Sequence, residues 1–192
     1  KLIKFSKEIL YEEYEAPKYF SNYYDYIAIG SDQIWNFTFK DISMNKAMAA
    51  FMPRNKKFSI SASFGVDFVP ERNSSIYNEL KENLENIEHI SVRERSASNI
   101  INKITGREDI EVLIDPTMMI LREEWEDVMK KPESIKPKRY ILKNILGKDS
   151  TVISDKINKF AKKHECEIID ISNKDSLYYD IGPSEFLYLV NN

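Results

Sequence analysis

The composition is that of an ordinary folded protein and excludes several classes of function. The chain has 192 residues, of which 42% are hydrophobic and 31% charged, as in typical globular domains. Its formal net charge of −3 gives no electrostatic reason to expect nucleic acid or an anionic membrane as a partner. The single cysteine excludes an internal disulfide and a thiolate metal cluster.

Short apolar segments alternate with helical patterns over the first 120 residues. The spacing of apolar side chains predicts a helical segment within Lys1–Tyr14. Strands are predicted at Tyr26–Gly30, at Phe58–Ala62 after a turn at Pro53–Lys57, at His89–Val92 and at Val112–Ile114. Helices are predicted between Glu71 and Ile87 and from Ala97 to Ile104, the second ending at Gly106. This alternation predicts an α/β fold with a parallel sheet and helices on both faces.

The character of the chain changes after Pro116. Trp125, Val128 and Met129 predict a short helix, and the lysines and prolines of Lys130–Lys138 indicate a linker. Further elements are a strand at Tyr140–Asn144, a helix from Val152 to Ala161, a strand at Ile168–Ile171 and a helix opened by Pro183. We therefore expect an N-terminal domain at 1–120, a helix and linker at 121–138, and the start of a second α/β domain at 139–192.

Five strings of residues occur in an order that is typical of one family. They are "GSDQIWN" at Gly30–Asn36, "SISASFG" at Ser59–Gly65, "ISVRERSA" at Ile90–Ala97, "TGREDIEVLIDPTMM" at Thr105–Met119 and "GPSEFLYLV" at Gly182–Val190. Together they resemble the polysaccharide pyruvyl transferase family, from about Tyr24 to Asn192. The resemblance implies two Rossmann-like domains in a GT-B-like arrangement. It also implies transfer of the enolpyruvyl group of phosphoenolpyruvate (PEP) to sugar hydroxyls of a cell-surface glycan, giving a pyruvate ketal and phosphate.

Two motifs typical of that family are not in this sequence. Its members usually open with a Gly-Asn-x-Gly-like stretch and continue into a Ser-Phe-His-Gly-like stretch, which here would fall before Lys1 and after Asn192. We therefore expect the chain to be the middle of a longer protein, with both Rossmann-like domains incomplete. If the family's histidine is the general acid, it lies outside this chain.

Arg93 is the best candidate for binding an anion. It follows the predicted strand His89–Val92 directly, and ligands bind at the carboxyl ends of strands in open α/β sheets. A planar guanidinium suits the carboxylate and phosphate of PEP. The alternative is an ordinary ion pair with an acid such as Glu94, which could instead orient Arg93 or stabilise the start of the following helix. Arg95 is expected to be solvated.

The segment after Gly30 supplies the other candidates. Gly30 would let a ligand approach the backbone, while Ser31, Asp32 and Gln33 would form hydrogen bonds to the sugar or to PEP. Asp32 is also the one candidate for a catalytic role, although the general acid is not identified. The alternative is that Ser31 or Asp32 only caps a helix that starts here.

Other residues are assigned mainly structural roles. Ser63 and Gly65 are expected to line the same site, and Asn36 to hold its loop by side-chain bonds to the backbone. Trp35 is expected in the core rather than as a sugar-stacking platform, and Asp115 in a hinge turn before Pro116. His89 and His164 are expected to be structural, and His164 with Cys166 makes a poor zinc site.

The chemistry implied by the family needs no metal and no cofactor, because phosphate can leave against arginines and helix N-termini. The expected partners are PEP and a glycan acceptor, without nucleic acid and without a transmembrane segment, and a homo-oligomer is an option. A cytoplasmic location fits the cysteine usage, with attachment to the inner face of the membrane as a further option. Two rival functions stay open: a GT-B glycosyltransferase that uses a nucleotide sugar, and a non-catalytic relative that binds a glycan or a partner.

Overall fold

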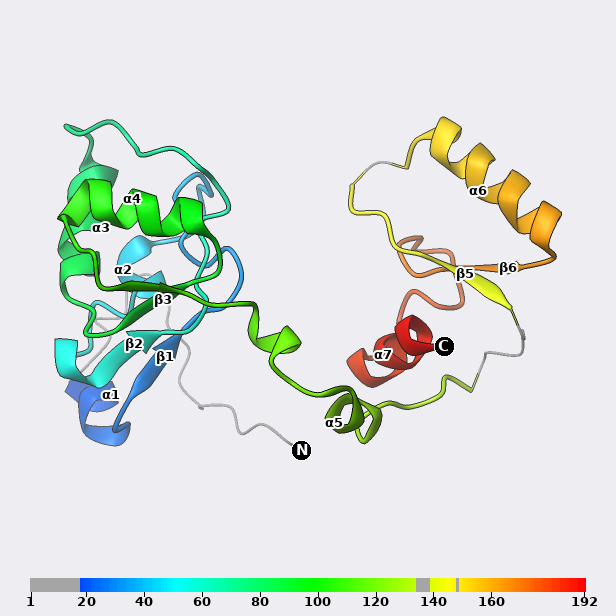
Figure 1. The fold of residues 1–192 in the computed structure, drawn as a ribbon, viewed down its shortest axis with the longest axis horizontal. Coiled ribbons are helices and arrows are strands. Elements are labelled where there is room, and N and C mark those ends of the chain that lie inside the picture. The colour runs from blue at the N-terminus through cyan, green and yellow to red at the C-terminus, as the bar shows by residue number, and fades with distance from the viewer. Residues whose placement is uncertain (1–17, 134–138, 148) are drawn as a thin grey trace. The chain divides into compact units, whose positions relative to one another are not determined.

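The computed structural model describes residues 18–133, 139–147 and 149–192. The chain divides into two compact units, Lys1–Met119 and Ile120–Asn192, and Figure 1 traces both. The predicted helical segment within Lys1–Tyr14 and positions 134–138 of the predicted linker lie outside the described residues. None of the described helices has the length and apolar character needed to cross a lipid bilayer.

Four short strands of the first unit form two parallel pairs. They are β1 (Ile27–Ile29), β2 (Lys57–Ser59), β3 (Ile90–Val92) and β4 (Ile110–Val112). β1 pairs with β2 and β3 with β4, both in parallel. Parallel bridges from Phe58 to His89 and from Ala62 to Val92 connect β2 to β3. The predicted parallel α/β fold is therefore confirmed, as a mixed α/β structure with short two-stranded parallel sheets.

The helices of the first unit start and end at residues suited to these positions. The elements are α1 (Lys18–Tyr23), α2 (Met44–Ala47), the 3₁₀ turns η1 (Arg54–Lys56) and η2 (Pro116–Met118), α3 (Ser75–Glu85) and α4 (Arg95–Thr105). The hydroxyl of Ser74 accepts a hydrogen bond from the amide of Tyr77 and so starts α3. Gly106, with φ 75°, ends α4 as predicted.

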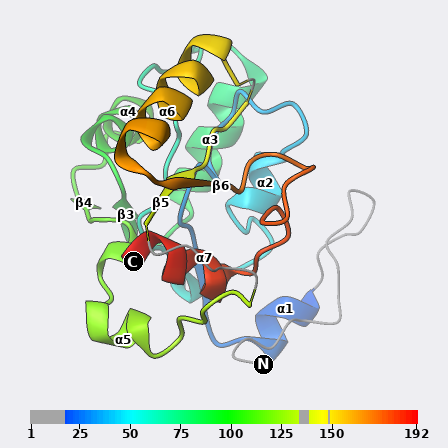
Figure 2. The same cartoon turned by 90° about the vertical axis from the view of Figure 1, so that its right-hand side faces the viewer.

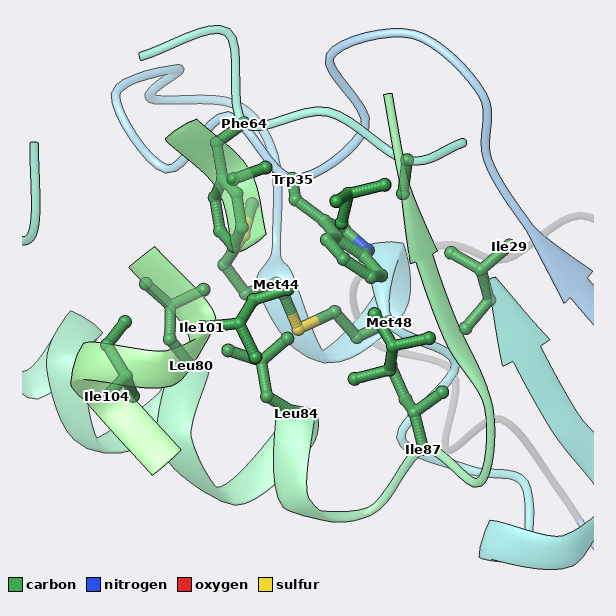
Figure 3. Packing of buried hydrophobic residues seen from close by; sticks show 14 of the residues in the cluster. Ile29, Trp35, Met44, Met48, Phe64, Leu80, Leu84, Ile87, Ile101 and Ile104 are labelled. Carbon is green, nitrogen blue, oxygen red and sulfur yellow. The ribbon is translucent and has the colours of Figure 1, made fainter. Parts of the chain in front are cut away.

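The core of the first unit lies between the sheet and the pair α3 and α4 (Figure 3). Side chains from α3 and α4, such as Leu84 and Ile101, meet Met44 and Met48 of the α2 segment there. Trp35 packs among them with its ring 5.6 Å from that of Phe64 and is fully buried. The expectation that Trp35 belongs to the core is confirmed.

Lys57 departs from the sequence-based expectation. It was predicted in the turn before the second strand, but it is the first residue of β2 and only 1% exposed. Its ammonium group donates a hydrogen bond of 3.0 Å to the carbonyl of Ala49. The prediction was wrong because a lysine is seldom buried without a carboxylate partner, and no local pattern around Lys57 indicates such an environment.

Arg107 joins the end of α3 to the start of β4, and its side chain is only 13% exposed. Its guanidinium donates hydrogen bonds to the carbonyls of Leu84 (3.1 Å), Ile87 (2.6 Å) and Glu88 (3.0 Å). It also pairs with Asp109 at 2.8 Å. The last carbonyls of a helix have no partner within it, so Arg107 supplies charged donors just where the chain leaves α3.

We expect Arg107→Ala to lower the free energy of unfolding by about 2 kcal/mol, because these carbonyls lose their charged donor. Arg72→Ala is the matched control, since Arg72 is exposed, and should change it by less than about 0.5 kcal/mol. Urea unfolding of both variants measures the difference. Equal stability of the two variants would show that the Arg107 contacts contribute nothing to the fold.

The second unit contains a two-stranded parallel sheet and three helices. Its elements are α5 (Arg122–Glu126), β5 (Tyr140–Lys143), α6 (Thr151–His164), β6 (Glu167–Asp170) and α7 (Pro183–Asn191). Figure 2 shows α6 and α7 on opposite sides of the strand pair, as does Figure 1. Ile169 and Leu189 are buried between β6 and α7. The predicted strand–helix–strand–helix order after Tyr140 is confirmed, with boundaries shifted by one to three residues.

Candidate functional site

The segments that follow β1, β2 and β3 are bonded to one another at the carboxyl ends of these strands. The amide of Ser63, after β2, donates to the carbonyl of Asp32, after β1, at 2.9 Å. The amide of Arg93, after β3, donates to the carbonyl of Ala62 at 3.0 Å. Because parallel strands all end at one edge, these bonds gather the candidate residues into one cluster.

The segment after Gly30 forms turns, so the alternative that Ser31 or Asp32 caps a helix starting here is wrong. Residues 32–35 are in turns, and Asp32 has a left-handed φ of 54°. A helix would need the carbonyl of Asp32 for its own hydrogen bonding, but that carbonyl accepts from Ser63 instead. The fold therefore replaces a helix by a loop that is fixed to the neighbouring strand.

Asn36 holds this loop as predicted. Its side-chain oxygen accepts from the amide of Thr38 at 3.0 Å, and its nitrogen donates to Gln33 Oε1 at 2.8 Å. The Gln33 side chain in turn lies against Gly65, where an added methyl group would overlap it. Two of the candidate residues, Gln33 and Gly65, are thus in contact.

Arg93 points its three guanidinium nitrogens at three carboxylates. Nη1 lies 3.1 Å from Asp115 Oδ2, Nη2 lies 3.4 Å from Asp32 Oδ1, and Nε lies 3.8 Å from Glu94 Oε2. The hydrogen bond to Asp115 is the largest cause of the raised pKa of Arg93. Arg93 is therefore a permanent cation with a fixed orientation at the end of β3.

The Asp115 carboxylate is itself fixed by hydrogen bonds from Thr117. Its Oδ1 accepts from the amide of Thr117 at 3.0 Å and from the hydroxyl of Thr117 at 2.8 Å. These bonds, followed by the contact with Arg93, hold the pKa of Asp115 below its ordinary value. Asp115 was predicted only as a hinge residue. It does begin the turn η2, but it also holds Arg93, and its place just after a strand that ends at the same edge was the signal.

Glu94 links Arg93 to the segment after β2. Its Oε1 accepts from the hydroxyl of Ser63 at 2.9 Å and from the amide of Phe64 at 3.3 Å. Because the Glu94 side chain turns toward that segment, no side-chain hydrogen bond caps α4. The first turn of α4, which is the positive end of the helix dipole, therefore faces the cluster.

A shallow hollow of about 410 Å³ lies beside these residues. It is lined by Ser63, Gly65, Val66, Asp67, Arg93, Glu94 and Ser96. Three of the candidate residues, Ser63, Gly65 and Arg93, therefore share one surface. Gly30, Ser31, Asp32 and Gln33 do not line the hollow, although Asp32 and Gln33 contact residues that do. Nothing in the sequence pointed to Val66, Asp67 or Ser96.

His89, His164 and Arg95 lie at positions that suit the structural or solvated roles expected for them. The carbonyl of His89 accepts from the amide of Ser59 at 2.9 Å, just ahead of β3 and away from the Arg93 end of that strand. His164 lies in the last turn of α6, and Arg95 is exposed. Among the described residues, no three His, Cys, Asp or Glu side chains gather in a way that could hold a metal ion.

Comparison with known proteins gives one match. A family model of polysaccharide pyruvyl transferases matches residues 2–192. No curated protein and no solved structure matches the chain significantly. Since the family match covers nearly every residue, the chain belongs to the polysaccharide pyruvyl transferase family.

Proposed function

We propose that this protein transfers the pyruvyl group of PEP to sugar hydroxyls of a cell-surface glycan, forming a pyruvate ketal. The observation that carries the proposal is Arg93, a cation held at the carboxyl edge of a parallel sheet in a chain of this family. PEP brings a carboxylate and a phosphate, and both are groups that a guanidinium recognises by paired hydrogen bonds. The site thus suits the anionic donor.

The reaction balances without a redox partner. One sugar hydroxyl oxygen bonds to the central carbon of PEP while a proton is added to the methylene carbon, which becomes a methyl group. A second hydroxyl oxygen then bonds to the same carbon, and the bond to the phosphate oxygen breaks. Of the two hydroxyl protons, one balances the methyl group and the other leaves with phosphate. The protein has to stabilise the departing negative charge and supply the proton.

The described residues divide these tasks. Arg93 binds the donor anion, and the uncapped first turn of α4, which includes the hollow residue Ser96, favours negative charge at the same place. Ser63 and Gly65 form the wall toward the sugar, and Gln33 packs against Gly65. Asp32, next to Arg93, is our candidate for a catalytic role.

Family membership also supports an arrangement of two Rossmann-like domains of the GT-B kind. In this proposal the domains are 1–120 and 139–192, joined by a helix and linker at 121–138. In the second unit, α6 connects the parallel strands β5 and β6 along the chain. Such a strand–helix–strand unit is the kind from which a second Rossmann-like domain is built.

Thermal unfolding of the full-length protein tests the function. PEP at about 100 times its dissociation constant should add about 2.7 kcal/mol of stability, a shift of several degrees. A shift of the unfolding midpoint with nucleotide sugars alone would indicate that the protein is a glycosyltransferase. No shift with either ligand would favour a non-catalytic relative.

Arg93→Ala is expected to weaken PEP binding by about ten- to a hundredfold, because charge-assisted hydrogen bonds to the donor are lost. Most of the PEP-induced shift should therefore disappear, while the midpoint without PEP shows whether the variant is folded. Arg95→Ala is the matched control, since Arg95 is the exposed arginine two positions along the chain. An unchanged PEP shift in folded Arg93→Ala would remove Arg93 from the donor site.

A further inference from the structure

The three carboxylates around Arg93 differ in how firmly their own side chains are fixed. The Asp115 side chain is only 20% exposed and is fixed by Thr117. Glu94 is fixed by Ser63 and Phe64. Asp32 differs from both, because its side chain is 84% exposed and its distance to Nη2 is 3.4 Å.

Asp32 can release Arg93 without rearranging the loop. Its backbone is anchored by the hydrogen bond from the Ser63 amide to its carbonyl, so only the side chain has to rotate. In the described part of the chain, the Arg93 guanidinium is the one hydrogen-bond partner of the Asp32 carboxylate. An exposed ion pair of this kind is weak, because water and salt screen it.

An anionic donor needs N–H groups of the same guanidinium. Nη1 donates a hydrogen bond to the supported Asp115, and the supported Glu94 lies 3.8 Å from Nε, whereas Nη2 faces the exposed and weakly held Asp32. We propose that Asp32 is a displaceable counter-ion of Arg93, which yields Nη2 to the donor and so lowers the affinity for it. This inference rests on the proposed function.

The proposal predicts a change in PEP affinity opposite to the one expected if Asp32 formed hydrogen bonds to PEP. Removing the charge of Asp32 removes a competitor and one repulsive charge, so PEP should bind more tightly. Removing the charge of Asp115 loosens the guanidinium, so PEP should bind less tightly. Asparagine is suitable at both positions because it keeps the shape of aspartate, and it tolerates the left-handed backbone of residue 32.

Isothermal titration calorimetry of the full-length protein with PEP tests this difference. Asp32→Asn should lower the dissociation constant by about two- to fivefold at low salt, the range of an exposed ion pair. The gain should shrink at about 1 M salt, where charges are screened beyond about 3 Å. Asp115→Asn should raise the dissociation constant, and Asp25→Asn, at an exposed position ahead of β1, should leave it unchanged.

Each result decides the matter. Tighter, salt-sensitive binding in Asp32→Asn alone supports the counter-ion role. If wild type binds PEP and Asp32→Asn binds it equally or less tightly, the counter-ion role is wrong and the proposed function stands. An equal gain in Asp25→Asn would mean a general charge effect and would also overturn it. If neither wild type nor Asp32→Asn binds PEP, both proposals fail.

Discussion

Lys57→Met is expected to raise the free energy of unfolding by about 2 kcal/mol at pH 7. Burial lowers the pKa of Lys57 from its ordinary 10.5 to about 8. That difference corresponds to a cost of about 3 kcal/mol for keeping the charged amine in the folded state. Methionine avoids this cost and loses one hydrogen bond, worth about 1 kcal/mol. The carbonyl of Ala49 keeps a partner, because it also accepts from the amide of Met52 at 2.9 Å.

The gain in unfolding free energy from Lys57→Met should decrease as the pH rises. Between pH 8 and 10.5 the folded protein has lost the Lys57 proton while the unfolded chain still holds it. The unfolded state then binds more protons, so wild-type stability rises with pH relative to the variant. The advantage of Lys57→Met is therefore complete below pH 8 and largely gone by about pH 10.

Urea unfolding at pH 7 and pH 10, followed by tryptophan fluorescence, measures both effects, since Trp35 lies in the same unit. Lys103→Met is the matched control, because Lys103 is exposed on α4 and its replacement should shift stability equally little at both pH values. A Lys57→Met variant that is less stable than wild type at pH 7 would mean that the buried amine is a net stabilising group.

Gly30→Ala is expected to lower the free energy of unfolding by about 3 kcal/mol. Gly30 has a φ of 126°, a conformation that residues with a side chain rarely adopt. The added methyl would also overlap the carbonyl oxygen of Ile60. That oxygen is backbone next to β2, so the overlap can be relieved only by moving the strand end. The unfolding midpoint in urea should fall accordingly.

Gly106→Ala separates backbone strain from overlap. Gly106 also has a positive φ, 75°, but an added methyl there meets no atom within 4 Å. Only the cost of the left-handed conformation applies, about 1 kcal/mol. Equal losses in the two variants would show that the contact with Ile60 is unimportant and that φ alone decides the cost.

The sequence alone determined the local elements of this protein. Helix α4 was predictable because apolar residues recur at helical spacing and Gly106 ends the pattern, both within a dozen positions. The strands were recognisable as short apolar runs, and their alternation with helices implied that they run in parallel. This in turn placed Arg93 at a ligand-binding edge before any contact was known.

Tertiary structure decided what surrounds these elements. Whether Asp32 would cap a helix depended on a hydrogen bond from Ser63, 31 positions away, and the pairing of Arg93 with Asp115 joins the ends of two strands. Lys57 is buried where its ammonium group meets the carbonyl of Ala49, in the turn after α2, and no local pattern encodes this contact. Local spacing fixes which backbone conformations are favourable, but the hydrogen-bond partners and dielectric of a side chain depend on residues brought together only by folding.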